Sequence, residues 1–272
     1  METLSLREEV LAKVETLKVV PTLNSIIVEL FRVMNDRNTS FNQLFNIVRY
    51  DQAISSKIIS IANSAYYNRG AKIGNLERAM IVIGFDQIKN IVTSLAYLNE
   101  ILGKWRLSRR DLAHLWTHSL GVACAAQVLA NKTMIEEPGT VFTVAILHDI
   151  GKMVFYTLGD EYWKVIEEAQ KSGKGINTLE KEAFGIDHQE VGYFISVKWR
   201  FPEEFSEVIR RHHQRGEAKG SLLDLVRVAD VFIDNPACDL GAEGIMLLSE
   251  KESIERETKR VSELLGVVDG RD

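Results

Sequence analysis

The chain has 272 residues, of which 46% are hydrophobic and 26% charged, and its formal net charge is −5. This composition excludes the disordered, collagen-like and disulfide-dense classes, and the mild negative charge argues against nucleic acid as a partner. Two cysteines, Cys124 and Cys238, make no disulfide framework, so a reducing compartment is expected. No apolar run approaches the ~20 residues of a membrane span, and we expect a cytoplasmic protein with no membrane contact.

The first 105 residues have the hydrophobic spacing of short helices, and strand-like alternation does not persist anywhere in them. Helices are expected over 7–17 and 21–35. Another follows an N-cap at Thr39-Ser40, and a further one runs from Asn75 to Gly84. The sequence therefore predicts a bundle of about five helices over residues 1–105.

The rest of the chain is also mostly helical in pattern. A capping box at Ser108–Asp111 predicts a helix to about Ala130, and amphipathic spacing predicts helices over 160–171 and 178–200. The apolar run 141–147 is ambiguous, because its β-branched residues favour a strand locally. Further helices are expected to begin at Pro202, to end before Pro236 and to lie on the surface over 245–265. We expect the second part of the chain to divide into an HD-like unit, 106–235, and a C-terminal tail, 236–272.

All six histidines fall in the second part of the chain, together with two aspartates in apolar surroundings. His114 and His118 are four residues apart on an expected helix, so both leave the same face. His188 is expected at a helix start, directly after Asp187. Histidine and aspartate side chains are the nitrogen and oxygen ligands that suit divalent transition metals. The candidate residues are His114, His118, His148, Asp149, His188, His212, His213 and Asp230.

Each candidate also has a simpler explanation. A single histidine on a helix is more often hydrogen-bonded or solvated than a ligand. Asp230 could pair with Arg227 one helical turn away, and Asp149 could cap the turn that follows it. His213, which follows Arg210 and Arg211, could be solvated. Residue by residue, these alternatives stay open.

The order of His118, then His148-Asp149, then Asp230 resembles the H…HD…D signature of the HD superfamily of metal-dependent phosphohydrolases. The stretches 50–67 and 79–84 resemble the HDOD family, whose members are HD-related output domains of bacterial signalling proteins. The resemblance extends over about 15–235. It implies an all-α fold, with the N-terminal bundle packed on an HD-like helical domain and residues 141–147 in a helix.

The resemblance also implies a metal site. His118, His148, Asp149 and Asp230 match the four HD metal positions, and His188, His212 and His213 match the extra histidines of HD-GYP phosphodiesterases. His114 stands where those enzymes can carry another ligand, and Lys152 matches a lysine that contacts substrate phosphate. We therefore expect two divalent transition-metal ions, of iron, manganese, nickel or zinc, that share Asp149. No Gly-Tyr-Pro follows His213, so the resemblance does not extend to hydrolysis of cyclic di-GMP.

Two functions follow from these patterns. One is a metal-dependent phosphohydrolase or phosphodiesterase that acts on a nucleotide-like phosphoester, with Asp149 and Lys152 as the catalytic residues. The other is a regulatory module without catalysis, because many HDOD proteins lack the metal ligands. A signalling partner is expected to dock on residues 1–105, and the tail 245–265 offers a surface for a homodimer.

Overall fold

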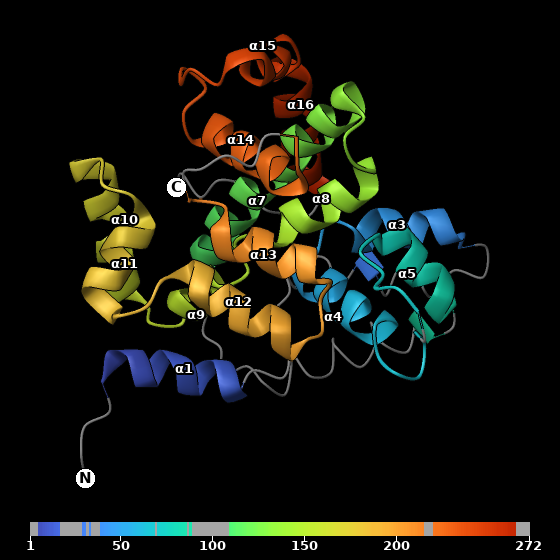
Figure 1. Cartoon of the computed structure of the whole chain (residues 1–272), viewed down its shortest axis with the longest axis horizontal. Helices are drawn as coiled ribbons and strands as arrows, with labels where there is room; N and C mark the ends of the chain where they lie inside the picture. The colour runs from blue at the N-terminus through green and yellow to red at the C-terminus, as the bar shows by residue number, and fades with distance from the viewer. Residues whose placement is uncertain are drawn as a thin grey trace.

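The computed structural model describes residues 5–16, 29–30, 33, 39–68, 70–85, 87–88, 109–214 and 220–264. Within these ranges every regular element is an α-helix, as the sequence predicts (Figure 1). The helices are α1 (Leu6–Thr16), α3 (Phe41–Val48), α4 (Gln52–Ala62), α5 (Leu76–Ile83), α7 (Arg109–Thr133), α8 (Pro138–Leu147), α9 (Lys152–Tyr156), α10 (Asp160–Ser172), α11 (Ile176–Phe184), α12 (His188–Lys198), α13 (Glu203–Arg211), α14 (Leu222–Asp234), α15 (Gly241–Ser249) and α16 (Lys251–Leu264).

Local capping explains where several helices begin and end. Ser40 caps α3 in a reciprocal capping box with Gln43, and Asn75 caps α5 by accepting from the backbone N–H of Arg78. Gly84 ends α5 with φ +88°, a conformation that favours glycine. These predicted boundaries are confirmed. Most of the predicted helix 21–35, and Ser108 of the second capping box, lie outside the described residues.

The long helix α7 lies at the centre, where it packs against α8, α14 and α16 (Figure 1). Gly121 allows α14 to approach closely, because a Cβ at this position would lie 3.3 Å from Ile233 Cδ1. The N-terminal helices α4 and α5 pack on α8, and the buried Gln52 side chain donates to the Ile146 carbonyl at 2.6 Å. The two parts of the chain are therefore joined through α8, while the division near residue 105 stays a prediction.

Three segments show how packing decided what local pattern left open. Residues 141–147 are helical in α8 and buried on every side, which is why they lack an amphipathic period. The interval 178–200, predicted as helical, is two helices: Gly185, with φ +71°, ends α11, and α12 begins at His188 with Asp187 as its N-cap, so the predicted helix start at His188 is confirmed. The predicted surface helix 245–265 is likewise two helices, α15 and α16, which meet at Glu250. No described helix is both long and apolar enough to cross a membrane.

Candidate metal centre

Seven of the eight predicted ligands converge on one buried site, and most of them stand at helix ends. His148 and Asp149 directly follow α8, His188 is the first residue of α12, and His212 and His213 directly follow α13. His118 on α7 and Asp230 on α14 complete the set from within their helices. Five helices therefore supply these side chains.

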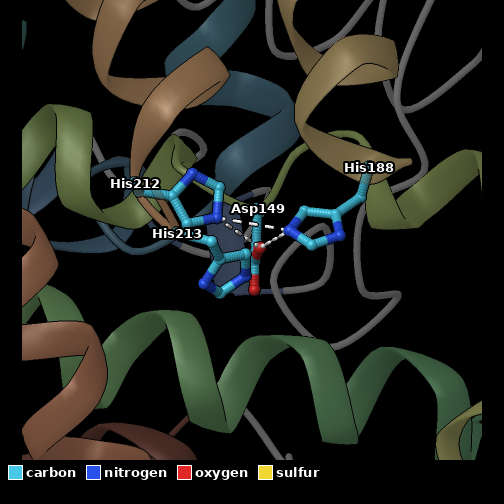
Figure 2. Close-up of side chains that lie close together, drawn as sticks. All are labelled: Asp149, His188, His212 and His213. Atoms are coloured by element: carbon cyan, nitrogen blue, oxygen red, sulfur yellow. Dashed lines mark hydrogen bonds and ion pairs between the residues drawn. The ribbon is translucent and has the colours of Figure 1, made fainter. Parts of the chain in front are cut away.

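The first cluster consists of Asp149, His188, His212 and His213, whose ligand atoms all lie within 4.8 Å of one another. Figure 2 shows these side chains around one carboxylate oxygen. Asp149 Oδ1 is 3.4 Å from His188 Nε2 and 3.5 Å from His212 Nε2, and the two histidine nitrogens are 3.2 Å apart. Three nitrogens and one oxygen thus lie close enough together to bind one metal ion.

The second cluster consists of His118, His148 and Asp230. Asp230 Oδ1 is 3.1 Å from His118 Nε2 and 3.5 Å from His148 Nε2. The other oxygen of Asp149, Oδ2, lies 3.5 Å from His118 Nε2 and 3.4 Å from His148 Nε2. Asp149 therefore faces the first cluster with one oxygen and the second cluster with the other.

These residues fit a pair of metal ions. Five of the buried inward atoms make no hydrogen bond among the described residues: His118 Nε2, His148 Nε2, Asp149 Oδ1, His213 Nε2 and Asp230 Oδ1. Leaving so many buried polar atoms unsatisfied costs about 1–3 kcal/mol each unless another group binds them. Ligands held at about 2.0–2.2 Å from one ion lie roughly 3.0–3.5 Å from each other. The Asp149 and Asp230 oxygens lie 3.1–3.5 Å from the Nε2 atoms of His118, His148, His188 and His212, which agrees with this spacing.

The outer nitrogens of three histidines are held by fixed acceptors. His148 Nδ1 is 2.7 Å from the Ala145 carbonyl, and His212 Nδ1 is 2.9 Å from the Ile209 carbonyl. With Nδ1 donating its proton outward, Nε2 of each ring faces the centre and offers its lone pair to a metal ion once it is deprotonated. This is the arrangement that orients histidine ligands in metalloproteins.

The third acceptor is a buried carboxylate that the sequence analysis missed. Glu180 Oε2 is 2.5 Å from His188 Nδ1, and Tyr162 donates its hydroxyl proton to Glu180 Oε1 at 2.7 Å. Burial raises the pKa of Glu180 to about 7, although Lys152 and the bonds from His188 and Tyr162 act to lower it. In the continuous helix expected over 178–200, Glu180 and His188 would stand about 12 Å apart along the axis. Only the break after Phe184 brings them together.

The charges at the centre balance one another. Burial alone would raise the pKa of Asp149, but His148 and Lys152 hold it well below its usual range. Burial alone would lower the pKa of His148, but Asp149 and Asp230 raise it to about 10. Lys152 Nζ lies 2.5 Å from Asp149 Oδ2. The buried carboxylates of Asp149 and Asp230 therefore favour positive charge at the centre, which His148 and Lys152 supply and which a bound metal ion would also supply.

His114 is the predicted ligand that lies outside both clusters. Its Nδ1 is 2.7 Å from the Tyr156 hydroxyl, and its ring meets Trp163 edge-on at a centroid distance of 5.4 Å. The alternative that Asp230 pairs with Arg227 is not what the structure shows, because Arg227 pairs with Asp224 at 2.5 Å. His213 is not solvated beside Arg210 and Arg211: its Nδ1 faces the centre, 3.4 Å from Asp230 Oδ2. A direct role for His114 at a metal stays a prediction.

The fold and the site together define an all-helical protein with an HD-type arrangement of histidines and aspartates. The HDOD domain family model matches residues 20–215, and the chain belongs to this family. The sequence is 22% identical over 200 residues to an uncharacterized protein of Treponema pallidum, and the match covers 71% of this chain and 37% of that protein. The chain thus corresponds to little more than a third of that relative's length.

Solved structures show the same fold. A response regulator of Methylococcus capsulatus, MmoQ, superposes with a TM-score of 0.67 at 22% identity, covering 87% of this chain and 91% of that one. A virulence factor of Campylobacter jejuni gives a TM-score of 0.68 at 17% identity, with 98% of each chain covered. An HDOD domain protein of unknown function from Geobacter sulfurreducens gives 0.54 at 22% identity, covering 95% and 97%. At these identities the similarity establishes the fold.

Proposed function

We propose that this protein is a signalling-family phosphohydrolase that cleaves a phosphoester at a centre of two transition-metal ions. The observation that carries the proposal is the position of Asp149, whose two oxygens face separate His/Asp clusters at 3.4–3.5 Å. A carboxylate with one oxygen in each ligand set would hold two ions close together, as two-metal hydrolysis requires. The unsatisfied buried atoms around it support the same function.

The residues of the two clusters would bind different ions. His118, His148 and Asp230 would hold one ion, and His188, His212 and His213 the other, with Asp149 shared between them. When bound, the ions supply Lewis acidity and activate water for in-line attack on phosphorus. Lys152 Nζ lies 2.5 Å from Asp149 Oδ2. Burial alone would lower the pKa of Lys152, but Asp149 raises it, so Lys152 stays protonated. Its positive charge would neutralise charge on the phosphoryl oxygens.

The test begins with elemental analysis of the purified chain, where we expect about two equivalents of iron, manganese, nickel or zinc. A panel of phosphomonoesters, cyclic nucleotides and cyclic dinucleotides then tests turnover. Asp230→Asn should remove activity, whereas Asp224→Asn on the same helix should retain it, since Asp224 pairs with Arg227 away from the clusters. Absence of stoichiometric transition metal would overturn the site, and failure on the whole panel would overturn catalysis.

A second candidate is a regulatory module that acts through protein contacts. The observation that favours it is a set of exposed apolar side chains on the N-terminal part, where Tyr66 is 83% and Ile81 64% exposed. Exposed apolar groups of this size are used in protein contacts. A pull-down with the wild-type chain and with Ile81→Glu would test this surface. Ile245 and Leu248 on α15, 70% and 53% exposed, would be tested for dimer formation by analytical ultracentrifugation.

A further inference from the structure

A cavity of about 720 Å³ lies beside His118, between α7, α14 and α16, and a smaller cavity of about 260 Å³ lies at the N-terminal end of α8. We call the smaller one the junction cavity. Its wall comes from α3 and the start of α5 in the N-terminal part, and from α7 and α8 in the second part. Among the described residues, no member of either metal cluster lines it.

Arg49, which directly follows α3, brings a positive charge to the junction cavity. Its Cζ lies 4.2 Å from the centre of the Phe142 ring. Nη2 is 3.4 Å from Gln127 Oε1, and Nε is buried without a hydrogen bond among the described residues. Glu257, whose charge Arg49 also influences, binds Arg260 at 2.6 Å. A guanidinium has more N–H donors than these contacts use, so Arg49 can still bind an anionic group.

Glu137, which directly precedes α8, brings a negative charge to the same cavity. Its Oε1 accepts a hydrogen bond from the Gly139 N–H at 2.9 Å, and Oε2 accepts from the Thr140 N–H and the Asn75 side chain, each at 2.7 Å. All of these donors are neutral. Burial alone would raise the pKa of Glu137, but the hydrogen bonds lower it, so the carboxylate is ionised at neutral pH. Oε1 can accept a further bond.

The charges in the wall indicate the kind of ligand. Arg49 and Glu137 line one cavity without pairing with each other, and Glu77 in the first turn of α5 adds a second negative charge. A simple anion such as phosphate is therefore disfavoured, whereas a molecule with both an ammonium group and a carboxylate complements the wall. Leu76 and Phe142 are apolar. The volume is slightly below the range of drug-sized sites, about 300–1,000 Å³, so the ligand has roughly the size of one amino acid.

We propose that the junction cavity binds a free amino acid with an apolar side chain. Its carboxylate accepts hydrogen bonds from Arg49, its ammonium group donates to Glu137, and its side chain packs against Leu76 and Phe142. The ligand thereby links the N-terminal helices to α7, which carries His118, and to α8, which leads into His148. This site does not depend on the proposed hydrolysis.

Calorimetry on the full chain tests the proposal with alanine, valine, leucine and methionine. We expect saturable binding of at least one of them at one site per chain. Analogues of the best ligand that lack its ammonium group or its carboxylate should bind at least ~10-fold more weakly, because each leaves a charged group of the cavity without a partner. No binding by any of the four, equal binding by the analogues, or tighter binding of inorganic phosphate would overturn the proposal.

Two variants locate the site. Arg49→Met keeps an apolar side chain against Phe142 but removes the charge, and Glu137→Gln keeps an oxygen that can accept from the Gly139 N–H. Each should weaken amino-acid binding at least ~10-fold. Arg78→Met is the matched control, because it removes the same charge from an exposed side chain on α5 outside the cavity wall, and it should bind as the wild type does.

Urea titration checks that each variant is folded. If Arg49→Met does not fold, Glu137→Gln decides the question. Wild-type affinity in a folded Arg49→Met or Glu137→Gln chain would overturn the assignment of the amino acid to this cavity.

Discussion

Glu180 and His188 are eight residues apart in sequence, yet Glu180 Oε2 lies 2.5 Å from His188 Nδ1 and 2.8 Å from the backbone nitrogen of His188. The carboxylate therefore holds both the ring of His188 and the first turn of α12. Tyr162 fixes the other carboxylate oxygen from α10. One buried residue thus links three helices to the orientation of one candidate metal ligand.

This contact gives the first prediction. Glu180→Gln should lower metal affinity by about 10–100-fold, because the amide accepts the His188 proton less strongly and no longer fixes the ring. Competition with a chromophoric chelator measures the affinity. The matched control is Glu182→Gln on the same helix, which is half-exposed and pairs with Lys174 at 3.4 Å. If both variants bound metal equally well, Glu180 would have no orienting role.

A second prediction separates His114 from the cluster residues. His148→Ala removes a buried inward nitrogen, whereas His114→Ala removes a ring that contacts Tyr156 and Trp163. We expect His148→Ala to lose at least one metal equivalent by elemental analysis, and His114→Ala to lose less. Equal losses would establish His114 as a ligand.

A third prediction concerns Gly151, which lies between the His148-Asp149 pair and Lys152. A Cβ at this position would lie 2.0 Å from the His188 carbonyl oxygen and 2.7 Å from the Gly192 nitrogen. Gly151→Ala should therefore push α12 away, with a loss of roughly 1–3 kcal/mol in the free energy of unfolding and weaker metal binding. Urea titration measures the first effect.

Gly70→Ala is the control for this substitution. The nearest atom to a Cβ there, Asn68 Oδ1, is 3.9 Å away, so stability should change by less than about 0.5 kcal/mol. Gly151→Ala with wild-type stability and metal content would show that α12 accommodates the methyl group without strain.

A fourth prediction concerns the two thiols. Burial raises the pKa of Cys124 to about 11, against about 8.5 for an unfolded thiol, while Cys238 is exposed. At pH 8 a thiol reagent should label one cysteine per native chain and two in denaturant. Labelling of both thiols at the same rate in the native chain would contradict the buried position of Cys124.

The raised pKa of Cys124 also predicts how the free energy of unfolding depends on pH. A neutral thiol is favoured in the folded state, so this contribution to stability is complete below about pH 8.5 and is lost as pH rises toward 11. Compared with Cys124→Ala, the wild type should lose more stability over that interval. Parallel urea titrations at pH 8 and pH 10.5 measure the difference.

The sequence by itself determined the helical class, several helix boundaries and seven of the histidines and aspartates that the fold brings together. The Ser40 and Asn75 side chains accept hydrogen bonds from backbone N–H groups three residues further on. Such helix starts can therefore be predicted from a short stretch of sequence. Seven histidine and aspartate positions were predicted from motif order, and they do converge.

Only the tertiary structure decided how these residues meet. The meeting of α7, α8, α12, α13 and α14 at one centre and the cavity beside His118 depend on helices that pack across long intervals of sequence. Helical spacing reports which face of one helix is apolar, and it carries no information about which other helix covers that face. For this reason the candidate ligands, with Asp149 shared between two sets, could be predicted from the motifs, whereas their orienting partners and the adjoining cavity could not.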